Sequence, residues 1–274
     1  MMTHPAKQVE PLFTRPGGTP AGLDNLFLGK AAVLICNGPS AEQVDPYLLD
    51  KPGFVTMGIN NGSHIIRPNL WCAQDSPTKF MASIWEDPKI MKFTRKSYNK
   101  AAYTPEDVQP TRWVRDCPNL FFHRINSHTE AHDWFDRTSI SWGIPDGKGG
   151  HRVSTFMCAM CVLYRLGIRE IAIIGADFRM TKEQPYFFEE NKSDSGIASN
   201  NELYRLMNAF CAQLYPIMLS KGLQVVNCTP NSGLTAFPTM PFEEWVARHA
   251  LSIEESTEGM YNRPMHKQPN EVKR

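Results

Sequence analysis

The sequence lacks any long apolar run, and this absence argues against a membrane-spanning helix. No stretch of the 274 residues approaches the roughly 18 consecutive apolar residues that a transmembrane helix needs. The first residues, MMTHPAKQVEPLF, also lack the apolar core of a secretory signal. We therefore expect a cytoplasmic protein with no membrane span.

Paired cysteines and strong net charge are also missing. The seven cysteines are odd in number, and most of them stand in apolar segments, which is typical of small core residues in a reducing compartment. Cys158 and Cys161 have CxxC spacing, and His128 and His132 lie four residues apart, but neither pair has a second pair at zinc-ligand spacing. We predict no metal site and no resident cofactor. The net charge of +1 is ordinary for a globular protein.

Short apolar segments alternate with amphipathic ones, and this alternation indicates an α/β fold. Five segments read as buried strands, and three as helices. The strands are predicted at 31–36, 54–60, 70–75, 171–176 and 223–228, and the helices at 154–166, 201–222 and 241–251. A shorter helix after Ser40 is expected over 41–49. The pattern predicts a Rossmann-like, mostly parallel sheet with helices on both faces.

The chain reads as one α/β domain over residues 29–252. Residues 1–28 are rich in Pro and Gly and are expected to form an extended arm. Residues 78–150 break the α/β pattern, and we predict an inserted, partly helical substrate region there. Residues 181–201 are polar and are expected to form a loop over the site. The polar residues 253–274 are expected to be disordered.

Polar residues follow the predicted strands where a parallel sheet would bring them together. In such sheets, ligands bind outside the carboxyl ends of the strands. The turn Asn37-Gly38-Pro39-Ser40 follows the first strand and offers backbone amides to a phosphate, although no GxxxxGK[ST] loop is present. The other strand ends carry Asn60, Asp75, Gly175, Asp177, Asn231 and Ser232. Their convergence predicts a nucleotide site.

The same segments carry a family resemblance. LICNGPS, MGIN, the segment from RVST to GADF with its LGIREI linker, and NCTPNS resemble in this order the bacterial sialyltransferases of the Campylobacter type. They also resemble the wider superfamily of the MptE-like 6-hydroxymethylpterin diphosphokinases. The resemblance covers about residues 30–75 and 152–240. It implies nucleotide contacts for Asn37, Gly38, Ser40, Asn60, Ser154, Thr155, Gly175 and Asp177.

The resemblance implies a nucleotide-sugar-dependent glycosyltransferase, but the sequence departs from the family at the catalytic base. The sialyltransferases carry a histidine before the late helix, and the corresponding SDSGIASNNEL has none. We expect another base, either His151 or Asp194, to take the proton of the acceptor hydroxyl. Arg152 is expected to steer the anionic donor. Two alternatives are a pterin-type pyrophosphokinase, with Mg²⁺ held by Asp75 and Asp177, and a non-catalytic nucleotide-binding module.

A basic segment is the candidate acceptor site. Residues 89–124 contain eight Lys or Arg and three acidic residues, an asymmetry that can mark an anionic partner. Lys92, Arg95 and Lys96, with Lys100, would share one face if the segment were helical. We therefore predict acceptor contacts at Lys92, Arg95 and Lys96. The acceptor would be a nucleic acid such as modified DNA, or a glycan or lipid-linked glycan, and a solvated charged face is the competing interpretation.

Overall fold

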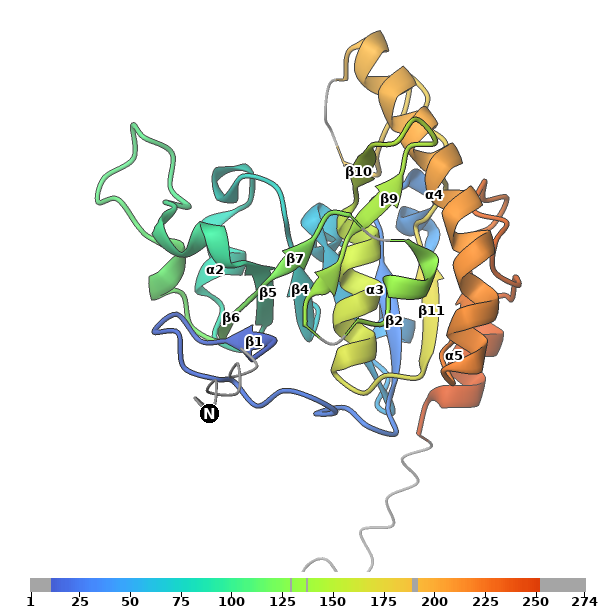
Figure 1. The fold of residues 1–274 in the computed structure, drawn as a ribbon, viewed down its shortest axis with the longest axis horizontal. Helices are drawn as coiled ribbons and strands as arrows, with labels where there is room; N and C mark the ends of the chain where they lie inside the picture. The colour runs from blue at the N-terminus through green and yellow to red at the C-terminus, as the bar shows by residue number, and fades with distance from the viewer. Residues whose placement is uncertain (1–10, 129, 137, 189–191, 252–274) are drawn as a thin grey trace, which may run out of the picture.

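The computed structural model describes residues 11–128, 130–136, 138–188 and 192–251. Its centre is an eight-stranded sheet in the order β1-β6-β5-β4-β3-β2-β11-β12 (Figure 1). Every neighbouring pair is parallel except β1–β6, which is antiparallel. The strands are β1 (Phe13–Thr14), β2 (Ala31–Ile35), β3 (Phe54–Ile59), β4 (Leu70–Cys72), β5 (Met91–Arg95), β6 (Leu120–His123), β11 (Glu170–Ile174) and β12 (Gln224–Asn227). The prediction of a mostly parallel α/β sheet is confirmed.

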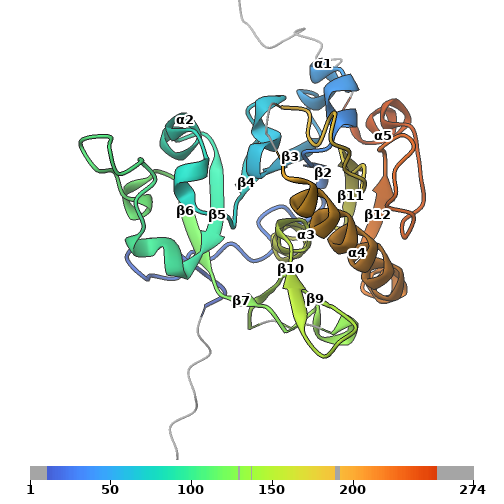
Figure 2. The ribbon, with the colours of Figure 1, turned by 90° about the horizontal axis from the view of Figure 1, so that it is seen from above.

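The sheet is buried on both faces, which is why its central strands are almost uniformly apolar. Alternate residues of β2 point to opposite sides: Ala32 and Leu34 face the core under α3 (Thr155–Arg165) and α4 (Asp194–Ser220). Val33 and Ile35 face a second core with α1 (Pro46–Leu49) and α5 (Phe242–His249). Figure 2 shows α3 and α4 on one side of the sheet and α5 on the other.

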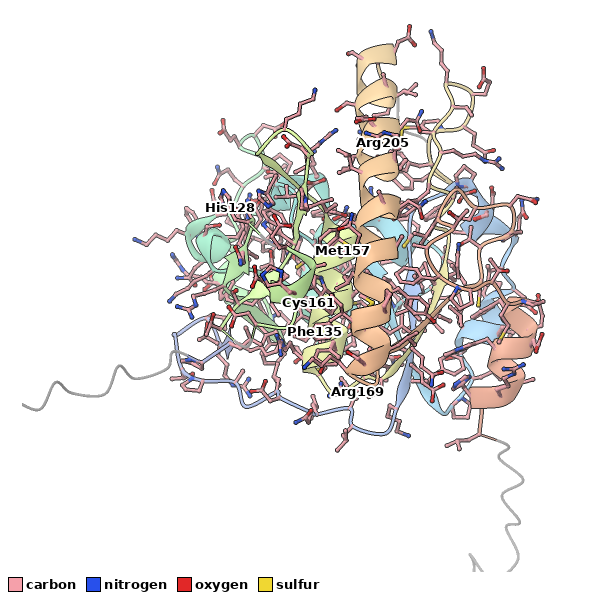
Figure 3. The ribbon with its side chains drawn as sticks, turned by 45° about the vertical axis from the view of Figure 1, so that its right-hand side comes forward. His128, Phe135, Met157, Cys161, Arg169 and Arg205 are labelled. Atoms are coloured by element: carbon pink, nitrogen blue, oxygen red, sulfur yellow. The ribbon has the colours of Figure 1, made fainter. Side chains whose placement is uncertain are left out.

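Helix α3 lies deepest in this arrangement. Met157 and Cys161, labelled in Figure 3, are fully buried between the sheet and the elements packed over it. The Met157 sulfur lies 3.8 Å from the Cys211 sulfur of α4, so the two helices pack closely. This packing explains the Cys158–Cys161 spacing as part of a buried helix surface.

The predicted insertion at 78–150 is not confirmed as a separate unit. β5 and β6 lie inside this range but extend the central sheet, and α2 (Ala82–Glu86) covers their outer face. Two small sheets, which lie partly within this range, stand in front of α3 (Figure 1). In one, β7 (Ile125–Asn126) pairs with β8 (Ile140–Ser141); in the other, β9 (Gly143–Pro145) pairs with β10 (His151–Val153).

The described part of the predicted arm is anchored rather than free. β1 pairs with β6 at the far edge of the sheet, and the Asn25 amide donates to the Arg165 carbonyl at the end of α3. The segment therefore runs under the sheet from one side to the other, as Figure 1 shows in dark blue. Residues 1–10 and the predicted tail at 253–274 lie outside the described residues.

Two helix boundaries differ from the prediction. Helix α4 begins at Asp194, not near residue 201, because Ser193 caps it by accepting from the Gly196 amide at 3.1 Å. Its first turns project beyond the sheet at the top of Figure 1. The predicted helix 41–49 is instead a 3₁₀ helix, η1 (Pro39–Gln43), followed by α1. Ser40 lies inside η1, and Pro46 starts α1, as suits a residue with no amide to donate.

Candidate functional site

A cleft of about 890 Å³, counting the space open to solvent, lies at the carboxyl ends of β2, β3, β4 and β11. From β2 the chain runs to β3 on one side, and later to β11 on the other side. The cleft therefore lies at the topological switch point of the sheet, the place where open α/β sheets bind ligands. The first turn of α3 and the side of α4 close its walls.

Two loops meet at the floor of the cleft, and Gly38 makes their contact possible. The Gly38 amide donates to the Gly175 carbonyl at 2.8 Å. A Cβ on Gly38 would lie 2.0 Å from Asp177 Oδ2 and 2.6 Å from that same carbonyl. Only glycine allows this approach.

Asp177 ties the two loops together. Its Oδ2 accepts from the Ser40 hydroxyl at 2.7 Å and from the Ser40 amide at 3.3 Å. The carboxylate is 9% exposed and also lines the cleft. Asp177 therefore fixes the shape of the floor as well as offering a polar group to a ligand.

Asp177→Ala is expected to lower the free energy of unfolding by about 1.5–3 kcal/mol, because a hydrogen bond to a buried charged group contributes about that much. Ser40→Ala removes the same hydroxyl bond from the other side, so the double variant should lose less than the sum of the two single variants. Urea unfolding of the three variants measures this. Strict additivity would show that the two side chains do not act as a pair.

Two asparagines present unpartnered acceptors to the cleft. Asn37 Oδ1 and Asn60 Oδ1 are buried and have no hydrogen-bond partner among the described residues. Asn60 also adopts a left-handed backbone, with φ +47°, directly after β3. Buried polar atoms are nearly always paired, so these two indicate where ligand or water donors would bind. Asp75 lies beyond them at the end of β4, with its side chain 53% exposed and a 3.7 Å ion pair to Lys79.

The N-terminus of α3 forms the next part of the wall. Ser154 occupies the N-cap position, but its side chain makes no capping hydrogen bond. The residue is only 8% exposed, and both it and Thr155 line the cleft. The first-turn amides and the Ser154 hydroxyl therefore present donors at a positive helix end, an arrangement suited to an anion.

The opposite wall comes from residues that directly follow Asp177. Phe178 has φ +52°, an uncommon backbone for an aromatic residue. It stacks on Tyr204 of α4 with ring centroids 5.2 Å apart. Burial raises the pKa of Tyr204, so its phenol stays a neutral donor. Arg179 follows, exposed and lining the cleft, without a hydrogen-bond or ion-pair partner among the described residues.

Most of the predicted nucleotide-binding residues line this one cleft. They are Asn37, Gly38, Asn60, Asp75, Ser154, Thr155, Gly175 and Asp177. Pro39 starts η1 and does not line it. Ser40, Asn231 and Ser232 line a neighbouring cleft between β12, η1 and α5. The Ser232 hydroxyl bonds the Ala176 carbonyl, so it supports the floor from behind.

The predicted catalytic residues do not reach the cleft lining. Arg152 donates to the Ser199 carbonyl at 3.1 Å and to its hydroxyl at 3.0 Å, on the outer part of α4. Asp194 forms a 3.1 Å ion pair with Lys182, and its side chain is 79% exposed. His151 lies beside Glu130, 3.6 Å away, and its ring packs 5.1 Å from that of His128, which Figure 3 shows in the small-sheet region, away from α4.

Residues 92–100 do not form the helix that would place Lys92, Arg95 and Lys96 on one face. The segment is strand β5 followed by a 3₁₀ helix, η4 (Lys96–Lys100). Lys92 is fully buried, and its ammonium donates to the Ile90 carbonyl at 3.0 Å, the Pro118 carbonyl at 2.8 Å and the Asp87 carbonyl. Burial lowers the pKa of Lys92 to about 8. Lys92 therefore holds the core together and is not available to an acceptor, whereas Arg95 and Lys96 reach the surface.

Sequence reasoning missed several residues of the cleft, chiefly Phe178, Arg179 and Asn200. Phe178 and Arg179 could have been found by extending the strand-end argument two residues past Asp177. Asn200 could not, because residues 194–201 read as a polar loop rather than as the start of a helix.

Comparisons with protein-family models, with curated proteins and with solved structures found no match. Within the described ranges, no group of three or more His, Cys, Asp or Glu side chains is arranged to hold a metal ion. No helix in the same part of the chain has the length and apolar character needed to cross a membrane.

Proposed function

We propose that the protein is a nucleotide-sugar-dependent glycosyltransferase whose donor binds in the cleft at the switch point. The observation that carries the proposal is the polarity of this cleft. Unpartnered acceptors, Asn37 Oδ1 and Asn60 Oδ1, stand at the β2–β3 end. Donors and positive charge, from Ser154, the start of α3 and Arg179, stand at other parts of its wall. The nucleoside part of a nucleotide has hydroxyl and amino donors for the first set, and the phosphates of the nucleotide are acceptors for the second.

Glycosyl transfer needs a base for the acceptor hydroxyl and stabilisation of the departing phosphate, and we assign both to residues that line the cleft. The acceptor oxygen loses its proton and bonds the anomeric carbon, while the bond from that carbon to the phosphate oxygen breaks and its electron pair leaves with the nucleotide. Arg179 and the α3 amides would stabilise the charge that develops on the departing phosphate. Asp75 is the best placed carboxylate to take the proton, because it lines the cleft and is open to solvent at its edge. Transfer of this kind depends mainly on positioning.

The resemblance to sialyltransferases supports a nucleotide-sugar donor. This chain lacks their catalytic histidine, and we assign the role of base to Asp75 in its place. A pyrophosphokinase of the pterin type would use the same cleft but would require Mg²⁺, which Asp75 and Asp177 would hold for ATP. Chelator separates the two, since the kinase loses all activity and a metal-independent transferase does not.

Arg179→Gln tests the phosphate end of the cleft. In the parent protein, a nucleoside diphosphate should bind more tightly than its nucleoside. Arg179→Gln should lower the affinity for the nucleoside diphosphate at least about tenfold, because a charge-assisted hydrogen bond to the phosphate would be lost. Nucleoside affinity should stay within about twofold. Calorimetric titration of both ligands into both proteins measures the difference, over nucleotides chosen by a thermal-shift screen of nucleotides and nucleotide sugars.

Arg152→Gln is the matched control, because it removes a guanidinium that is bonded to Ser199 outside the cleft. It should leave the difference in affinity between the nucleoside diphosphate and the nucleoside unchanged. A loss in Arg152→Gln with none in Arg179→Gln would restore the original assignment to Arg152 and contradict this one. Absence of any nucleotide binding would reject the proposed function.

A further inference from the structure

Arg95 is a half-buried cation that forms no ion pair with any described acidic residue. It ends β5, and its guanidinium carbon lies 4.1 Å from the ring centroid of Tyr98 and 5.9 Å from that of Trp142. Its guanidinium donates to the Tyr98 hydroxyl, and Arg95 Nε is buried with no hydrogen-bond partner in the described part of the chain. Among the residues that the structure describes, neither Arg95 nor its neighbours Lys96 and Lys100 pairs with a carboxylate. Partly buried cations are normally paired, so Arg95 offers an unused charged donor to an anion.

Other buried polar atoms around Arg95 are also unpartnered. The Tyr98 hydroxyl donates to the Gln74 carbonyl at 2.9 Å, which brings Gln74 into the same cluster. Gln74 Oε1 and Trp142 Nε1 are buried without a hydrogen-bond partner among the described residues, while Gln74 Nε2 lies 3.2 Å from His123 Nε2. The cluster thus combines one acceptor without a partner, on Gln74, with two such donors, on Arg95 and Trp142. Native proteins rarely leave so many unsatisfied groups together.

The cluster adjoins the cleft on two sides. Gln74 directly precedes Asp75, which lines the cleft. The Ser154 amide, in the cleft wall, donates to the Trp142 carbonyl at 3.0 Å. A ligand group bound at Arg95 would therefore lie beside the carboxylate assigned as the base.

We propose that Arg95, Tyr98, Trp142 and Gln74 form the acceptor subsite, and that the acceptor is a nucleotide, either free or within a single strand. This inference rests on the proposed function for the reaction, but not for binding. Arg95, with exposed Lys96 beside it, would hold the phosphate. The amide and indole groups match a base edge, which presents donors and acceptors side by side. A neutral glycan would leave Arg95 unpaired, and a phosphate alone would leave the Gln74 acceptor unsatisfied.

Arg95→Gln should weaken the binding of a labelled single-stranded oligothymidylate at least about tenfold, and should reduce its log–log salt slope by about 0.7. Lys89→Gln is the charge-matched control. It removes a cation that precedes β5, at the opposite end of this strand from Arg95, and should change the affinity for the oligonucleotide less than about twofold. Fluorescence anisotropy at several salt concentrations measures both. Arg95→Lys keeps the positive charge and should keep the salt slope. A change in slope that occurs in Arg95→Gln but not in Arg95→Lys is then due to the lost charge and not to a folding defect.

Thymidine 5′-monophosphate distinguishes the two sources of the ligand. If it binds as tightly as the oligonucleotide and Arg95→Gln weakens both, the acceptor is a free nucleotide; if only the oligonucleotide binds, it is a strand. Equal binding by Arg95→Gln and Lys89→Gln overturns the proposal, as does the absence of binding to either probe. A loss of oligonucleotide binding in Arg179→Gln but not in Arg95→Gln also overturns the proposal, because the probe would then occupy only the cleft. Arg95-dependent binding without nucleotide-sugar binding would reject the glycosyltransferase and leave the subsite standing.

Discussion

Gly38→Ala is expected to abolish nucleotide binding, with at least a hundredfold loss of affinity, and to destabilise the fold. The new Cβ would lie 2.0 Å from Asp177 Oδ2 and 2.6 Å from the Gly175 carbonyl, so one of the two floor loops must move. Overpacking of this kind costs about 1–3 kcal/mol of unfolding free energy. Because both loops line the cleft, their separation changes the shape of the site itself. Thermal unfolding and calorimetric titration measure the two effects.

Gly17→Ala is the control, because a Cβ there would meet no atom within 4 Å. It should leave both stability and binding unchanged. The double variant Gly38→Ala/Asp177→Ala removes one of the two clashing groups and should be more stable than additivity of the single variants predicts. Nucleotide binding by Gly38→Ala at parental affinity would contradict the close approach of the two loops.

Lys92→Met is expected to cause the largest loss of stability, about 3–5 kcal/mol. Methionine has a comparable length but no donor, so the carbonyls of Ile90 and Pro118 would lose the ammonium that they accept from. The Asp87 carbonyl would lose it too but would keep the Ile90 amide at 3.4 Å. Each buried group without its partner costs about 1–3 kcal/mol. These carbonyls belong to the segments that enter β5 and β6, so the edge of the sheet should loosen first. Urea unfolding gives the total loss, and hydrogen exchange of β5 and β6 locates it.

Lys89→Met makes the same substitution three residues earlier, at an exposed side chain. Its effect should stay within about 0.5 kcal/mol. If Lys92→Met were equally mild while weakening oligonucleotide binding, Lys92 would be a surface acceptor residue, as the sequence suggested, and its assignment to the core would be wrong.

A thin wall separates the cleft from its neighbour, and it is built from groups that sequence reasoning placed in one site. On one side lie Asn37 and Asp177; on the other lie Asn231 and Ser232. The Ser40–Asp177 bond and the Ser232–Ala176 bond hold the wall together. Polar residues at strand ends thus have two roles here: some line the cleft, and others hold the loops that line it in place.

The sequence by itself determined the strands near the cleft and much of its lining. Apolar runs of strand length, each followed by Asn, Gly or Asp, are local signals, and they correctly predicted β2, β3, β11 and the start of α3 at Ser154. Strand ends in a parallel sheet meet at one edge, so Asn37, Asn60 and Asp177 were brought together from pattern alone.

Only the tertiary structure decided the rest, because it depends on which segments become neighbours. The pairing of β5 and β6 with the main sheet turned a supposed insertion into core, and it buried Lys92 among carbonyls that lie far apart in the sequence, such as those of Ile90 and Pro118. The early start of α4 placed Ser199 where it binds Arg152, so the cation that reaches the cleft is Arg179. A charge pattern shows how many cations a segment carries; the packing around each one decides whether it meets a carbonyl, an aromatic ring or a ligand.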